Sequence, residues 1–200
     1  MFLTFPCPLH TILIDTTHID EMVKYAYQER ELSKGVERSN AGGWQSHDDY
    51  HGKENPISNV IHSHLKTFFH NRDIFDEKSS MRMNSMWINI NGPGDFNHSH
   101  NHPGCDLSGV LWLKAPEKSG NVVFESPQSF THAKLVEVYS QKFKDESLFY
   151  DWFFVQPKVG LIIIFPAHLN HSVSQNKSDE DRISVAFNVV CNRNWGTMYE

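Results

Sequence analysis

The segment MRMNSMWININGPGDFNHSHNH, residues 81–102, decides the fold expected for this chain. Its polar or aromatic residues Ser85, Trp87 and Asn89 alternate with apolar side chains, a period of two that is typical of a strand with one buried face. Gly92-Pro93-Gly94 then turns the chain. Gly, Pro, Asn and Asp separate most of the later strand candidates, which are residues 108–114, 120–125, 133–139, 152–156, 160–165, 171–175 and 183–190.

Two helices are expected before this β region. The first begins at Thr17, which together with Asp20 fits a capping box, and it ends before Gly35. The second runs from Ile57 to His70 with one apolar stripe. Residues 39–46, SNAGGWQS, contain a Gly-Gly pair and predict an ordered loop. The remaining expectations are an edge strand or extended arm over residues 3–14 and a short helix or loop over residues 142–149.

This order of elements predicts a mainly β fold with N-terminal helices. Jelly rolls and cupin-like double-stranded β-helices have this size and can enclose a small-molecule or metal site, and two helices would buttress one outer face. We expect one domain over residues 1–200, with the helical buttress in residues 1–80 and the β-helix core with its metal site in residues 81–200.

Composition narrows the class of protein. The net charge of −6 argues against unaided binding to nucleic acid. Three widely spaced cysteines without a CxxC motif predict free thiols, which suit a reducing compartment. Because the longest aliphatic run, residues 161–165, is too short to span a bilayer, we expect a soluble cytoplasmic protein that makes no use of a membrane. The N-terminal helices and the Gly42-Gly43-Trp44 loop could form a substrate lid or the face of a homodimer.

Histidines in the second half of the chain suggest a metal site. His100 and His102 share one face of an extended backbone, and imidazole is a strong ligand for transition metals. His171 follows a buried-looking strand that barrel closure can bring beside them. Arg182, eleven residues further on, would point into the same cavity, where its fork geometry suits a carboxylate. A metal with a carboxylate-binding arginine describes a site for a 2-oxo acid.

At this point the chain resembles the 2-oxoglutarate/Fe(II)-dependent oxygenase family. The resemblance covers most of the chain in a consistent order. It is carried by residues 39–46, Trp87-Ile88-Asn89, Gly94-Asp95-Phe96, His100-Asn101-His102-Pro103-Gly104, Leu107-Ser108-Gly109-Val110, Ser119-Gly120-Asn121, Phe124-Glu125-Ser126-Pro127, residues 165–173 (FPAHLNHSV) and residues 181–188 (DRISVAFN).

The resemblance implies an oxygenase that binds Fe(II) and uses 2-oxoglutarate and O2, hydroxylating an unidentified substrate while 2-oxoglutarate is decarboxylated to succinate. By position, His100 would be the first iron ligand and His171 the distal one. Arg182, with Ser184 beside it, would hold the distal carboxylate of 2-oxoglutarate. Asn89, together with Trp87, would face the cavity from a neighbouring strand.

One departure from the superfamily pattern concerns the third iron ligand. Where the superfamily has HxD or HxE, this chain has His100-Asn101-His102. We favour His102 as a third imidazole, and Asp106 or Glu125 could supply a carboxylate instead. A neutral ligand would raise the net charge of the site by about one unit. His98 is expected outside the ligand set and His168 in a turn.

The alternative is a cupin-type metal protein that does not use 2-oxoglutarate, such as an isomerase, a 2-oxoglutarate-independent dioxygenase or a binding protein. Its four ligands would be His100, His102, Asp106 and His171. That arrangement leaves Arg182 without a role, so we rank it second.

Overall fold

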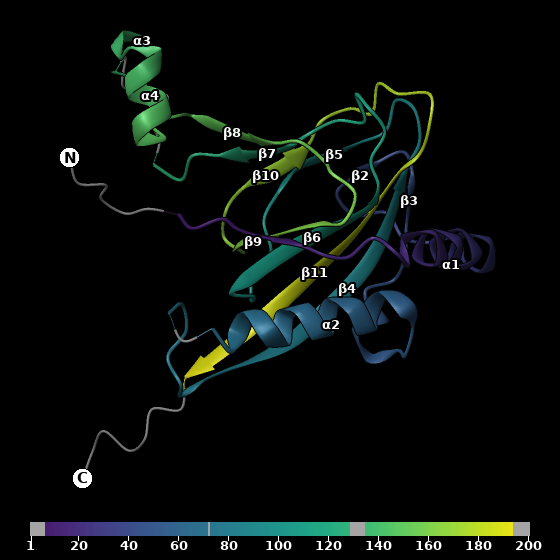
Figure 1. Ribbon diagram of the computed structural model, residues 1–200. Helices are drawn as coiled ribbons and strands as arrows, with labels where there is room; N and C mark the ends of the chain where they lie inside the picture. Colours follow the sequence, from purple (N-terminus) through teal and green to yellow (C-terminus); the bar gives the residue numbers. More distant parts are fainter. Residues whose placement is uncertain (1–6, 72, 129–134, 194–200) are drawn as a thin grey trace.

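The computed structural model describes residues 7–71, 73–128 and 135–193. Strands dominate, which confirms the mainly β prediction, and they form two antiparallel sheets (Figure 1). The larger sheet has the order β1-β9-β6-β11-β4-β3, formed by β1 (His10–Leu13), β9 (Leu161–Pro166), β6 (Leu107–Lys114), β11 (Arg182–Arg193), β4 (Ser79–Asn91) and β3 (Trp44–Gln45). The smaller sheet has the order β2-β5-β10-β7-β8, formed by β2 (Asn40–Ala41), β5 (Phe96–His100), β10 (His171–Val173), β7 (Val122–Glu125) and β8 (Trp152–Val155).

Two helices cover the outer face of the larger sheet (Figure 1), α1 (Ile19–Leu32) and α2 (Pro56–Phe69). Asn55 caps α2 by accepting from the amides of Ile57 and Ser58, with Pro56 in the first turn. The apolar residues of both helices join one core cluster with the outward face of the sheet, including Ile61 and Val185. The expected helical buttress is therefore present.

The first helix does not begin as expected. Its N-cap is His18, which makes no side-chain capping bond. Both the amide and the hydroxyl of Thr17 instead donate to Asp15, at 2.8 and 2.6 Å. The predicted Thr17 cap is therefore wrong, because the helix begins at Ile19 and Thr17 lies one residue before the cap position, in a turn held by Asp15.

Two strand assignments also change. The strand expected over residues 133–139 is wrong over the described residues, because Leu135–Val138 form the helix α3. Residues 133 and 134 lie outside the described residues. The expected loop 39–46 contains the two short strands β2 and β3, which belong to different sheets. Gly42 and Gly43 between them have φ of 74° and 68°, so the corner uses the left-handed region.

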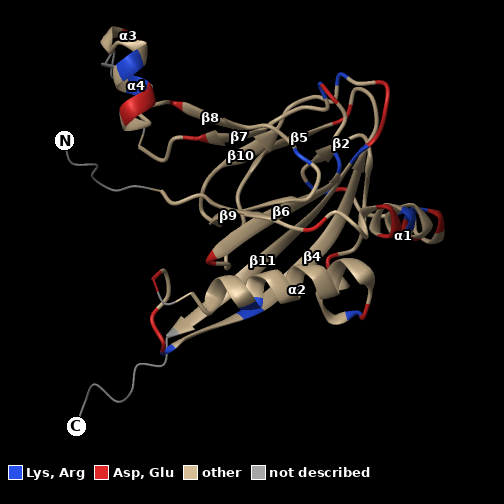
Figure 2. Ribbon diagram, in the orientation of Figure 1, with Lys and Arg blue, Asp and Glu red and all other residues tan. Residues whose placement is uncertain are grey.

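The remaining short elements are the 3-10 helix η1 (Tyr50–Gly52) and α4 (Gln141–Ser147), which overlaps residues 142–149, where a helix or loop was expected. Figure 2 shows that charged residues lie mainly on α1, α4 and the connecting loops, whereas the strands of the larger sheet carry few. Cys7, Cys105 and Cys191 are free thiols, as predicted. In the described part of the chain, every helix is too short or too polar to cross a membrane.

Alternation along the strands gives the larger sheet two different faces. On β11, Ile183, Val185 and Phe187 face the helices, whereas Arg182 and Ser184 line a cavity between the two sheets. β4 and β6 follow the same rule, since antiparallel pairing in register places like faces together. The interior of the β-helix therefore carries a polar wall, which a purely structural core would avoid.

Candidate metal centre and cavity

Three histidines meet at one end of this cavity. β10 pairs antiparallel with β5 and sets His171 directly opposite His100, with their ring centroids 4.4 Å apart. His102 follows β5, and its amide donates to the carbonyl of Ala167 at 2.9 Å. One potential ligand atom from each imidazole lies within 4.8 Å of the others. The structure thus brings together all three histidines predicted as metal ligands.

The hydrogen bonds of these rings select one nitrogen for a metal. His100 Nδ1 contacts the carbonyl of His98 at 2.7 Å, and His171 Nδ1 contacts that of Leu169 at 2.9 Å. A carbonyl can only accept, so Nδ1 carries the proton and Nε2 presents its lone pair. Burial and the neighbouring imidazoles lower the pKa of His102 to about 3 and that of His171 to about 4. Neutral imidazoles are the form that binds iron, so this donor set fits a metal ion.

The two carboxylates considered as third ligands are engaged elsewhere. Asp106 Oδ2 accepts from the amide of Cys191 at 2.7 Å, and Glu125 Oε1 accepts from the hydroxyl of Ser99 at 2.6 Å. Among the described residues, the metal-binding cluster consists of the three histidines alone. The side chains of His98 and His168 are exposed.

The cavity itself has a volume of about 530 Å³, and its wall includes every predicted site residue. Asn89, Arg182 and Ser184 line it from β4 and β11, opposite each other in register at Ser184 and Asn89. Asn89 Oδ1 is buried without a hydrogen-bond partner among the described residues. A buried polar atom of this kind is costly unless a bound molecule satisfies it.

Arg182 is the buried cation of the cavity, with 1% of its surface exposed. Its Nη1 donates to the carbonyls of Ser119 and Ser174. Burial lowers the pKa of Arg182 to about 10, while the nearby Asp95 carboxylate acts in the opposite direction, so the guanidinium remains charged at neutral pH. No carboxylate within the described residues forms an ion pair with it. A buried guanidinium without a partner anion fits an anionic ligand.

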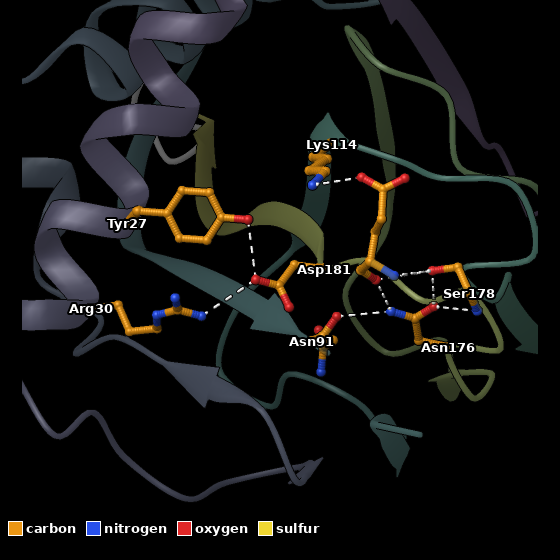
Figure 3. A network of polar contacts seen from close by, with 8 residues as sticks. Tyr27, Arg30, Asn91, Lys114, Asn176, Ser178 and Asp181 are labelled. Carbon is orange, nitrogen blue, oxygen red and sulfur yellow. Dashed lines mark hydrogen bonds and ion pairs between the residues drawn. The ribbon is translucent and has the colours of Figure 1, made fainter. Parts of the chain in front are cut away.

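A polar network holds the start of β11 in place (Figure 3). Tyr27 and Arg30 on α1 both contact the Asp181 carboxylate, at 3.1 and 3.4 Å. Asn176 donates to the carbonyls of Asn91 and of the residue before Asp181, at 3.0 and 2.8 Å. Because Asp181 directly precedes Arg182, these contacts fix the backbone position from which the Arg182 side chain extends. Sequence analysis did not identify this network, since its members come from α1 and from loops without a periodic pattern.

A second cavity of about 350 Å³ adjoins the first beyond His102. Asp48, which the sequence analysis also missed, lines both cavities. Asp48 lies in the segment that leads from β3 into η1, and only contact in the folded chain brings it near the histidines.

Comparison with known proteins identifies relatives of this architecture. A family model described as "Putative 2OG-Fe(II) oxygenase" matches residues 85–188, more than half of the chain. A search of curated proteins found no matching relative.

Several solved structures share the fold at 11–13% sequence identity, which confirms the predicted double-stranded β-helix. A prolyl-4-hydroxylase from Pseudomonas putida is 11% identical with a TM-score of 0.62, and 91% of this chain and 92% of that chain are covered. The α-ketoglutarate-dependent epimerase SnoN from nogalamycin biosynthesis is 13% identical with a TM-score of 0.66, covering 92% and 80%. HygX from Streptomyces hygroscopicus, with nickel and 2-oxoglutarate bound, is 11% identical with a TM-score of 0.55, covering 92% and 83%.

Proposed function

The chain belongs to the 2OG-Fe(II) oxygenase family, and from this premise we propose that it is a hydroxylase. Its cofactors are Fe(II) and 2-oxoglutarate. In the proposed reaction, substrate, O2 and 2-oxoglutarate give hydroxylated substrate, succinate and CO2. One oxygen atom enters the substrate and the other enters succinate.

We assign Fe(II) to His100, His102 and His171. The observation that carries this assignment is the convergence of three neutral imidazoles on one point of the cavity that also contains Arg182. Bound iron would supply the redox chemistry that couples O2 to the decarboxylation of the 2-oxo acid. A set of three neutral ligands leaves the full charge of the ion in place, which favours an anionic cosubstrate.

We assign the distal carboxylate of 2-oxoglutarate to Arg182, assisted by Ser184 and Asn89. The guanidinium can form a bidentate pair with a carboxylate, and Nε and Nη2 form no hydrogen bond with another described group. The apolar residues Trp112 and Phe165 also line the cavity and keep water from its interior. The cosubstrate would then lie between the arginine and the histidines.

The cupin-type alternative receives less support. It requires Asp106 as a fourth ligand, but that carboxylate is bonded to the backbone of β11 and is outside the histidine cluster. It also gives no role to the buried Arg182. We therefore retain the 2-oxoglutarate-dependent activity as the conclusion.

Metal titration followed by turnover tests the proposal. His100→Ala and His171→Ala should lose Mn(II) and Fe(II) affinity, whereas His98→Ala should keep it, because the ring of His98 is exposed and only its carbonyl contacts His100. The wild-type protein should release succinate with oxygen uptake when 2-oxoglutarate is added. Unchanged metal affinity in the first two variants would contradict the ligand set. Absence of succinate with every candidate substrate would contradict the reaction.

We also propose the cytoplasm as the working compartment, because free thiols persist under reducing conditions. The homodimer stays a prediction that sedimentation of the purified protein can decide. Both expectations are independent of the chemistry above.

A further inference from the structure

The two cavities adjoin each other at His102. They share a wall that contains Asp48, Ser85, Asn101, His102 and Asn188. Arg182 lines only the larger cavity, on the side assigned to 2-oxoglutarate. A molecule in the outer cavity would therefore reach the histidine cluster without displacing the cosubstrate, which is the position that a substrate must occupy.

Asp48 supplies the negative charge of this shared wall. It is the one acidic residue that lines the larger cavity among the described residues, and it lines the outer cavity too. The neighbouring Asp49 is neutralised by Lys53, with Oδ2 and Nζ 3.0 Å apart. The Asp48 carboxylate forms no hydrogen bond or ion pair within residues 7–71, 73–128 and 135–193. Asp48, whose carboxylate has no such partner, is therefore part of the wall that both cavities share.

The backbone around Asp48 is held firmly, so its side chain is presented from a fixed point. The carbonyl of Asp48 accepts from the amide of Met86 on β4 at 3.0 Å, and Asp49 forms a parallel bridge with the same residue. Tyr50 is 4% exposed and donates its hydroxyl to Glu29 on α1. A recognition group fixed in advance loses little conformational entropy when a ligand binds.

The rest of the outer cavity is hydrophilic. Amides of Asn84, Asn101 and Asn188 line it, and among the described residues Pro103 contributes the one aliphatic ring. His51 Nδ1 is buried there and has no hydrogen-bond partner in the part of the chain that the structure describes. No lysine or arginine is among the described residues that line the outer cavity; the exposed Arg38 lines the larger cavity only. Such a wall disfavours aromatic and aliphatic groups and repels carboxylates from Asp48.

We infer that the substrate is a small hydrophilic molecule with a cationic nitrogen group, an amine or a guanidine, and that the Asp48 carboxylate binds this group. The inference rests on the proposed function, since it places the substrate relative to the iron ligands and to 2-oxoglutarate. An ammonium or guanidinium donates charge-assisted hydrogen bonds to a carboxylate, and the surrounding amides can bond hydroxyl or carbonyl groups on the same molecule. Asp48 is then a specificity-determining residue.

The test compares amines with their N-acetylated partners on protein loaded with Mn(II) and 2-oxoglutarate. Suitable pairs are glucosamine with N-acetylglucosamine and cadaverine with N-acetylcadaverine, and binding is measured by ligand-observed NMR. In the wild-type protein each amine should bind more tightly than its neutral partner. Asp48→Asn should weaken amine binding by about ten-fold, the factor expected for one charge-assisted hydrogen bond, and should leave the acetylated compounds unchanged.

Glu54→Gln is the matched control, because Glu54 is exposed, lies six residues away in the same segment and lines neither cavity. It removes the same charge and should keep the preference for amines. Lack of binding by every amine, equal binding of both partners, or a preference that survives in Asp48→Asn would overturn the inference. Loading with Mn(II) and 2-oxoglutarate is measured first on the same sample. Protein that fails to load contradicts the proposed function, whereas protein that loads without preferring amines contradicts this inference alone.

Discussion

Replacing Arg182 with glutamine should raise the 2-oxoglutarate concentration needed for half-maximal turnover about 100-fold. The guanidinium uses Nη1 for two backbone carbonyls, which leaves two nitrogens for a bidentate carboxylate pair. Two charge-assisted hydrogen bonds at the low end of about 1.5 kcal/mol each give about 3 kcal/mol, and each 1.4 kcal/mol corresponds to a factor of ten. Glutamine keeps a donor for the carbonyls but loses the charge.

The assay is succinate release at saturating Fe(II) over a range of 2-oxoglutarate concentrations, alongside Mn(II) affinity measured without cosubstrate. Arg38→Gln, which removes an exposed arginine from the same cavity, is the control and should change the requirement far less. Arg182→Lys is made in parallel, because it retains the positive charge if the glutamine variant folds poorly. Equal losses of metal affinity and of 2-oxoglutarate affinity would refute the role given to Arg182.

Four further outcomes follow from the structure. His102→Asp should retain Mn(II) binding, whereas His102→Ala should weaken it by more than about 10-fold in calorimetric titration. The loss of a group that only supports a metal ligand already lowers metal affinity by about this factor, and the loss of the ligand itself should lower it at least as much. Burial lowers the pKa of His171 to about 4 from its ordinary 6.5, so between these two pH values the unfolded chain binds more protons than the folded protein. The free energy of unfolding of the metal-free protein, measured with urea, should therefore fall as the pH falls from 6.5 towards 4. A flat profile would contradict this. Asn176→Ala should cost about 1–3 kcal/mol in the same assay, since the buried Asn176 amide donates to the carbonyls of Asn91 and Glu180 and both lose this donor. Gly109→Ala should destabilise the fold by about 1–3 kcal/mol and so lower the melting temperature, because the new Cβ would lie 2.2 Å from Phe187 and overpack the core.

Local patterns were sufficient where a residue's neighbours in the chain decide its environment. The period of two around Trp87 correctly predicted a strand with one apolar face, because side-chain direction alternates in any extended backbone, and residues 183–190 form a strand as predicted. The same patterns failed for residues 133–139, where an apolar composition suits either a strand or a helix and no alternation distinguishes them. The cap at Thr17 failed for a different reason, since the helix begins one residue too late for Thr17 to be the cap, and its hydroxyl donates to Asp15 instead.

The sequence by itself determined the kinds of group at the centre of this protein: imidazoles spaced for one strand face, a distal histidine, and an arginine suited to a carboxylate. Only the tertiary structure decided which groups meet. Pairing of β5 with β10 put His171 opposite His100, left Asp106 and Glu125 bonded elsewhere, and brought Asp48 to the wall beside His102. The physical reason is that a site between two sheets is assembled from pairings between strands far apart in the chain, such as Ser184 with Asn89, and the packing of the whole β-helix sets the register of those strands.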